Sequence, residues 1–86
     1  MKDLEKILKA LANRRRLAIL KYLKNKRDIS VGDIADHIDL SFKATSRHLS
    51  VLFAADIIER DQRGLQMLYR LASPQKPAAR HIISLL

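Results

Sequence analysis

Two short amphipathic segments follow each other directly in the middle of the chain, and each opens on a serine. Ser30 and Asp33 have the spacing of a capping box, which predicts a helix running through Ile34, Ala35 and Ile38. Ser41 is a second N-cap candidate, and the segment 41–54 keeps five side chains along one side, at Phe42, Thr45, Leu49, Leu52 and Phe53. The short connection at residues 39–40 makes this pair a predicted helix-turn-helix.

Helical periodicity also predicts two helices before this pair. The first lies near residues 3–12, where apolar residues recur at i, i+3, i+4 and i+7, namely Leu4, Ile7, Leu8 and Leu11. Asn13 is expected to cap the second helix, with Leu17, Leu20 and Leu23 directed toward the core and Ile19 and Tyr22 on an adjacent stripe.

The pattern changes after Asp56. Met67, Tyr69 and Leu71 alternate with polar Gln66 and Arg70, so a β-hairpin over 57–71 is expected to close at Arg63–Gly64, where glycine supplies the positive φ of the turn. A linker at 73–77 leads to a final helix over 78–86 that opens near Pro77. The predicted fold is one mainly α domain over 1–86 with a small hairpin wing, in the order helix, helix, short strand, helix, helix, strand, strand, helix.

The charge balance points to a polyanionic partner. The 86 residues include 17 Lys and Arg against 9 Asp and Glu, which gives a net charge of +8 and a pI near 10.3. The absence of cysteine excludes disulfides, thiolate metal sites and a cysteine nucleophile. No apolar run is long enough to span a membrane and no signal peptide opens the chain, so we expect a soluble protein in the cytoplasm that does not bind membranes.

The second helix of the predicted pair has a surface suited to DNA. Its side opposite the apolar one carries hydrogen-bond donors and two cations but no carboxylate, at Lys43, Ser46, Arg47 and Ser50. Such groups match phosphates and the O6 and N7 acceptors of guanine. Any solvated helix face is polar, so the absence of acidic residues is what favours the nucleic-acid interpretation.

Two further groups of cations could contribute. Arg60 and Arg63 are expected toward the turn of the hairpin, where a wing could reach an adjacent minor groove or the DNA backbone, or serve only as solubilising charges. A stretch without acids holds seven more, some of which could touch phosphates: Arg14, Arg15, Arg16, Lys21, Lys24, Lys26 and Arg27. Arg16, beside Leu17, has an equally good structural interpretation.

Neither metal binding nor catalysis is indicated. His37, His48 and His81 lie in separate segments and lack the close spacing of a zinc site, so we expect no metal and no other cofactor. His48 is interpreted as a DNA-facing or partly buried donor. The serines at helix starts are caps, and no glycine-rich phosphate loop is present, so we expect no enzyme.

Residues 40–52 read L-S-F-K-A-T-S-R-H-L-S-V-L and resemble the recognition-helix signature L-S-x-x-x-x-S-x-H-L-x-x-L of ArsR/SmtB-type winged helix-turn-helix repressors. Upstream, residues 9–20 are similar to that family's K-A-L-A-x-x-x-R-x-x-I-L segment. Downstream, residues 69–71 are similar to its Y-x-L close of the wing. The resemblance covers most of residues 4–71.

The chain departs from the family's metal sensors. Residues 29–33 replace the paired cysteines of the thiolate sensors, and His81 stands alone where zinc sensors place a set of Asp and His ligands. Asp56 stands where relatives usually have glycine, and we expect the turn to survive because Asp tolerates left-handed geometry. The resemblance implies a homodimer joined by helices near 3–12 and 77–86, and the apolar end of the chain agrees, at Ile82, Ile83, Leu85 and Leu86.

Together with these residues, the resemblance implies a homodimeric repressor that binds double-stranded DNA at an inverted repeat. Four residues of the helix 41–54 are expected at base edges: Lys43, Ser46, Arg47 and His48. Arg60, Arg63 and Gln66 of the wing 57–71 are expected on the backbone or in the minor groove, and the helix start at Ser41 could receive a phosphate. The effector is not apparent. The alternatives are a winged-helix protein-interaction module without its own operator and a histidine-based metal-responsive repressor.

Overall fold

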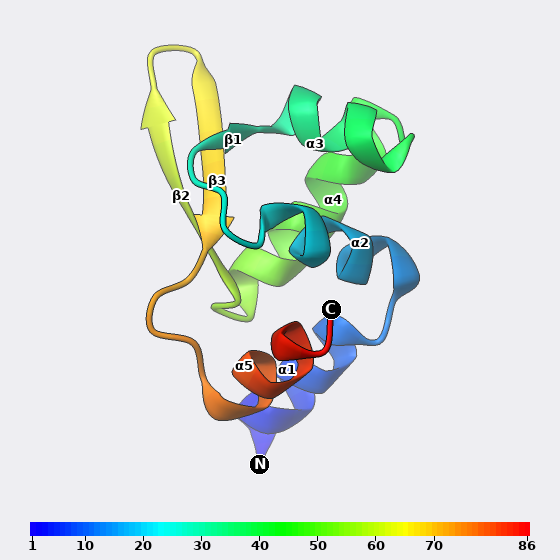
Figure 1. Cartoon of the computed structure of the whole chain (residues 1–86), viewed down its shortest axis with the longest axis vertical. Helices are drawn as coiled ribbons and strands as arrows, with labels where there is room; N and C mark the ends of the chain where they lie inside the picture. The colour runs from blue at the N-terminus through cyan, green and yellow to red at the C-terminus, as the bar shows by residue number, and fades with distance from the viewer.

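The computed structural model describes all residues 1–86 and contains five helices and a small antiparallel sheet. In chain order the elements are α1 (Lys2–Leu11), α2 (Arg14–Leu23), β1 (Ile29–Ser30), α3 (Val31–Ile38), α4 (Phe42–Ala54), β2 (Ile58–Arg63), β3 (Gln66–Leu71) and α5 (Pro77–Ser84). Helices α2, α3 and α4 pack against the sheet. Figure 1 shows the β2–β3 hairpin projecting beside α3 at one end, while α1, α5 and both termini lie at the other. The predicted order of elements is confirmed.

All three predicted helix caps are present. The Asn13 side chain accepts hydrogen bonds from the backbone N–H of Arg15 and Arg16, at 2.9 and 3.1 Å. Ser30 Oγ accepts from the N–H of Asp33 at 3.2 Å, and Ser41 Oγ accepts from that of Ala44 at 3.1 Å. Each bond satisfies an amide that has no partner inside its helix, and so fixes where the helix begins.

The connection between α3 and α4 is as short as predicted. Asp39 ends α3 in the left-handed conformation, with φ 54°, and Ser41 already caps α4. Asp56, after α4, also adopts a positive φ, 60°, so the predicted tolerance of aspartate at this turn is confirmed. These two aspartates turn the chain sharply at both ends of α4.

The sheet has the strand order β1–β3–β2, and both pairs are antiparallel. The last pair of the hairpin is Arg63 with Gln66, so the two-residue turn is Gly64–Leu65 and not Arg63–Gly64 as predicted. Gly64 takes the first turn position with φ 61°. The sequence required glycine in the turn but did not determine which of its two positions glycine would fill.

One hydrophobic core includes residues from every helix and from the sheet. Two predictions about which side of a helix is buried were wrong. Ile19 is fully buried with Leu20 and Leu23, whereas Leu17 is only half-buried. The reason is that α2 packs against α1, α3, α4 and β3, which together cover a different side of the helix. Phe42 is 62% exposed, because the first turn of α4 extends beyond the core that encloses Thr45, Leu49 and Leu52.

The two terminal helices pack against each other and leave apolar side chains outside. On α1, Ile7, Ala10 and Leu11 are buried, but Leu4 and Leu8 are 41% and 48% exposed, so the predicted single stripe divides between two faces. The last helix was expected to continue to Leu86, but it ends at Ser84. Leu85 follows it and is 69% exposed.

Candidate nucleic-acid interface

The exposed side of α4 carries the predicted polar stripe. Lys43, Arg47 and Ser50 are exposed and Ser46 is half-buried. No residue of α4 is acidic, and neither Lys43 nor Arg47 takes part in an ion pair. These side chains are therefore free to donate hydrogen bonds to an anionic partner.

His48 lies away from this stripe, on the side of α4 that faces α2. Its Nδ1 is 3.2 Å from Nη1 of Arg16. A guanidinium can only donate, so Nδ1 is the acceptor and the neutral ring carries its proton on Nε2. Burial, followed by the charges of Arg16 and Arg15, lowers the pKa of His48 below its ordinary 6.5. His48 is half-buried, as one of its two interpretations predicted, but its Nδ1 accepts a hydrogen bond and the ring lies on a different side of α4 from Lys43 and Arg47.

Arg15 and Arg16, from the acid-free stretch, form hydrogen bonds that stabilise the fold. Arg16 donates from Nε to the carbonyl of Ala10 at 2.6 Å and from Nη2 to that of Lys9 at 3.2 Å, which satisfies the end of α1. The structural interpretation of Arg16 is confirmed. Arg15 Nη1 donates to the carbonyl of Ile38 at 2.9 Å, at the end of α3. The sequence carried no signal for this second bond, because it joins residues far apart in the chain.

The structure separates the two wing arginines that were expected together near the turn. Arg63 lies next to the turn, opposite Gln66, and donates from Nη2 to Oδ2 of Asp28 at 3.2 Å. Arg60 lies further down, opposite Tyr69, with its guanidinium carbon 3.9 Å from the centre of the Phe53 ring. Side chains alternate between the two faces of a strand, so residues three apart point to opposite sides.

The outer face of the wing holds a set of ion pairs that the sequence analysis did not detect. Arg70 Nη1 lies 2.8 Å from Asp61 and 3.6 Å from Asp28, and its Nε lies 3.3 Å from Glu59. The hydrogen bond that Arg70 donates to the Asp61 carboxylate is the main cause of the raised pKa of Arg70. The sequence did offer a signal for these ion pairs, because Glu59 and Asp61 are two residues apart and so lie on the same face of β2. On this face Arg70 is fully engaged by carboxylates, so Arg63, which is paired only with Asp28, is the cation that a phosphate could reach.

The three histidines lie apart. His37 on α3 stacks on Tyr22, with ring centres 4.0 Å apart, His48 contacts Arg16, and His81 lies on α5. No three metal-ligating side chains gather anywhere in the structure. No helix combines the length and apolar character needed to cross a membrane.

Residues 13–60, which include the helix-turn-helix, match the family described as "Bacterial regulatory protein, arsR family". The chain belongs to this family. It is accordingly a DNA-binding transcription regulator with a winged helix-turn-helix fold. The match includes α4 with its free cations but ends before the turn of the wing.

Three relatives show the range of the family. The transcriptional repressor SdpR of Bacillus subtilis is 35% identical over 76% of this chain and 71% of its own length. The transcriptional activator HlyU of Vibrio cholerae is 35% identical over 84% of this chain and 66% of its own. The homodimeric winged helix-turn-helix DNA-binding domain Mb0332 of Mycobacterium bovis has a TM-score of 0.83 at 28% identity, covering 98% of this chain and 75% of that one. SdpR and HlyU are both named as regulators of transcription, one a repressor and the other an activator.

Proposed function

We propose that this chain acts as a homodimeric repressor that occupies promoter DNA in the cytoplasm at an inverted-repeat operator. Each subunit places its α4 in the major groove of one half-site, with half-site centres about 34–36 Å apart or a multiple of this distance. The observation that carries the proposal is the exposed stripe of α4, where Lys43 and Arg47 have no acidic neighbour on the helix and no ion-pair partner.

The residues divide between base contacts and backbone contacts. Lys43, Ser46 and Arg47 face base edges, where a guanidinium can bind guanine O6 and N7 together. Arg63 and Gln66, side by side at the end of the wing, reach the backbone or the minor groove, and Arg63 exchanges Asp28 for a phosphate. The start of α4 at Ser41 receives a second phosphate. Arg60 and His48 keep their partners Phe53 and Arg16, and therefore support the contact residues from either side of α4.

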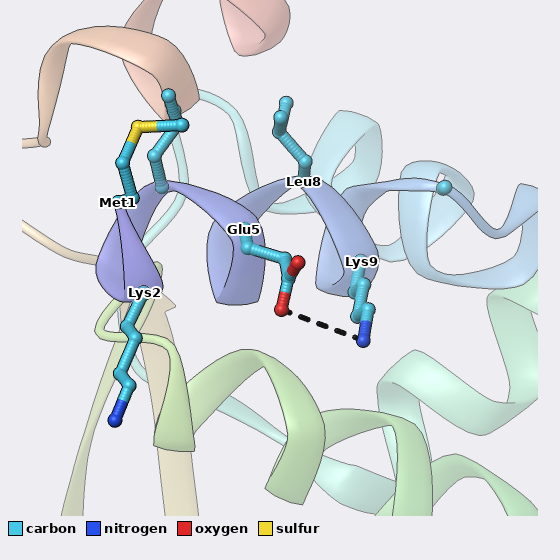
Figure 2. A pocket seen from close by; sticks show the side chains of 7 residues that line it. Met1, Lys2, Glu5, Leu8 and Lys9 are labelled. Atoms are coloured by element: carbon cyan, nitrogen blue, oxygen red, sulfur yellow. Dashed lines mark ion pairs between the residues drawn. The ribbon is translucent and has the colours of Figure 1, made fainter.

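The outward side of α1 supports the dimer. Figure 2 shows Met1 and Leu8 projecting from one side of the helix, and an ion pair between Glu5 and Lys9. Leu4, Leu8 and Ala12 border a shallow hollow of about 520 Å³ along this helix. An apolar stripe of this kind is self-complementary about a two-fold axis. The homodimer of Mb0332 and the repressor SdpR favour the same assembly and the same direction of regulation.

Selection of bound fragments from a genomic library, followed by gel shifts at several salt concentrations, tests the proposal. We expect a palindromic site whose affinity falls by orders of magnitude between about 50 and 200 mM salt, because phosphate contacts release counterions. Sedimentation of the free protein should give a dimer, and transcription from a promoter containing the site should fall when protein is added. A dimer that shifts no duplex at any salt concentration would instead indicate a protein-interaction module.

A further inference from the structure

Two large apolar side chains at the DNA-facing end of the molecule have no role in its core. Phe42, the first residue of α4, is 62% exposed, and Leu65, in the turn of the wing, is completely exposed. Both border a hollow of about 420 Å³ that lies between the wing and the first turns of α3 and α4. Apolar side chains placed on both rims of one hollow indicate a surface that a partner covers.

The hollow connects the two halves of the candidate interface. Ser46, from the stripe of α4, and Gln66, from the end of the wing, also line it. Its inner wall includes Val31 and Tyr69, which are almost completely buried. None of its lining residues is charged, so nothing in the hollow repels a polyanion, while Lys43 stands next to Phe42 on the exposed side of α4.

The expected position of the DNA duplex indicates which part of the DNA would fill this hollow. With α4 in the major groove and the wing at the neighbouring minor groove, the strand that separates the two grooves crosses the hollow between them. The apolar groups that this strand presents there are its deoxyribose carbons and, at the major-groove edge, the C5-methyl groups of thymines. Base contacts of a recognition helix come from its N-terminal residues, and Phe42 is the first residue of α4.

We propose that Phe42 recognises the C5-methyl group of one thymine in each half-site, and that Leu65 covers a deoxyribose of the same strand. Phenylalanine is suited to this contact because the methyl group is the one apolar feature that distinguishes thymine in the major groove. The inference rests on the operator binding proposed above and adds a base preference that the polar stripe of α4 does not supply.

The test replaces each thymine of the selected operator in turn with deoxyuridine, which removes only the methyl group. For the wild-type protein we expect one position per half-site at which affinity falls about fourfold, the effect of one buried methyl group. Phe42→Ala should bind the thymine and deoxyuridine operators equally well. If no position shows a loss that depends on Phe42, the inference is wrong.

Matched variants separate this contact from other effects. Val51→Ala removes an apolar side chain that is 41% exposed on the same helix but outside the hollow, and it should keep the full sensitivity to deoxyuridine. Leu65→Ala should weaken every operator alike and leave the salt dependence unchanged, since it removes no charge. Circular dichroism of each variant checks that the fold is intact.

The remaining outcomes also decide the question. If Phe42→Ala changes the sedimentation of the free protein, the hollow is a contact between copies of the chain, and the inference is wrong. If a small apolar compound occupies the hollow while Phe42→Ala leaves operator binding unaffected, it is wrong as well. A protein that binds no duplex overturns the proposed function together with this inference. A protein that binds its operator but does not distinguish deoxyuridine from thymine overturns this inference alone.

Discussion

The guanidinium of Arg16 donates to two carbonyls at the end of α1, those of Ala10 and Lys9, and to Nδ1 of His48 on α4. The last carbonyls of a helix have no partner within the helix, and a side-chain donor that reaches them replaces water. One side chain therefore holds the first helix in a fixed relation to the helix that carries the candidate base contacts.

Replacing Arg16 with methionine keeps an apolar stem of similar length but removes all three donors. We expect the free energy of unfolding to fall by about 2 kcal/mol, in the range for charged hydrogen bonds that are partly exposed. Urea denaturation monitored by circular dichroism measures this change. Arg14→Met is the matched control, because Arg14 is exposed and makes no side-chain hydrogen bond, and its effect should stay within about 0.5 kcal/mol. Equal losses in both variants would contradict the assigned role.

The lowered pKa of His48 gives stability a specific pH dependence. In the folded state the ring stays neutral below 6.5, whereas in the unfolded chain it takes up a proton near that value. The unfolded state then binds more protons, so the stabilising contribution is complete above pH 6.5 and is lost as the pH falls through the lowered pKa. Urea denaturation at pH 7.5 and pH 5 should show this loss in the wild type and a smaller one in His48→Asn, whose amide oxygen can accept from Arg16 at either pH. An identical loss in both proteins would assign the pH dependence to other groups.

At the scale of single elements, α4 allows a direct test of base recognition. Arg47→Ala should weaken operator binding by about 1–3 kcal/mol per half-site and relax the preference at one base pair, because a bidentate contact to guanine is lost. A binding-site profile from selected random duplexes measures the preference. Arg80→Ala removes an exposed cation from α5, at the opposite end of the molecule, and should change neither affinity nor profile. An unchanged profile for Arg47→Ala would remove this residue from base recognition.

The elements were predictable from sequence where their signals are local. Asn13, Ser30 and Ser41 each cap the helix that they were predicted to cap, since a cap depends on residues two or three positions away. The side of each helix that becomes buried depends on neighbours from distant segments. That is why the burial of Ile19 and the exposure of Phe42 and Leu8 could not be derived from periodicity.

The same distinction applies to the candidate site. The spacing of Lys43 and Arg47 on a helix without acids identified the exposed stripe of α4. The partners of Arg63, Arg60 and His48 come from the loop before β1, from α4 and from α2. Only the folded chain brings these pairs together, so the sequence carried no signal that Arg63, Arg60 and His48 have partners within the protein.

For the whole molecule, the outward side of α1 determines whether two chains associate. Leu8 is 48% exposed on an apolar stripe, and in a symmetric dimer this stripe meets its own copy. Leu8→Lys should raise the dimer dissociation constant about a hundredfold, because two apolar contacts are lost and two like charges approach each other.

Sedimentation equilibrium measures this constant, and loss of operator binding at low protein concentration should accompany it. Gln62→Lys adds the same charge on the exposed wing, away from α1, and should remain dimeric. If Leu8→Lys stays dimeric as well, the subunits associate through another surface.

Charge is spread unevenly over the molecule, and this follows from the ion pairs of the wing. On the wing's outer side, Asp28, Glu59 and Asp61 outnumber Arg63 and Arg70, so the overall excess of +8 is carried elsewhere. A body with separated charge has an electric dipole that rotates in the field of a nearby polyelectrolyte. At low ionic strength, DNA should therefore approach the outer side of the wing less readily than it approaches the rest of the molecule.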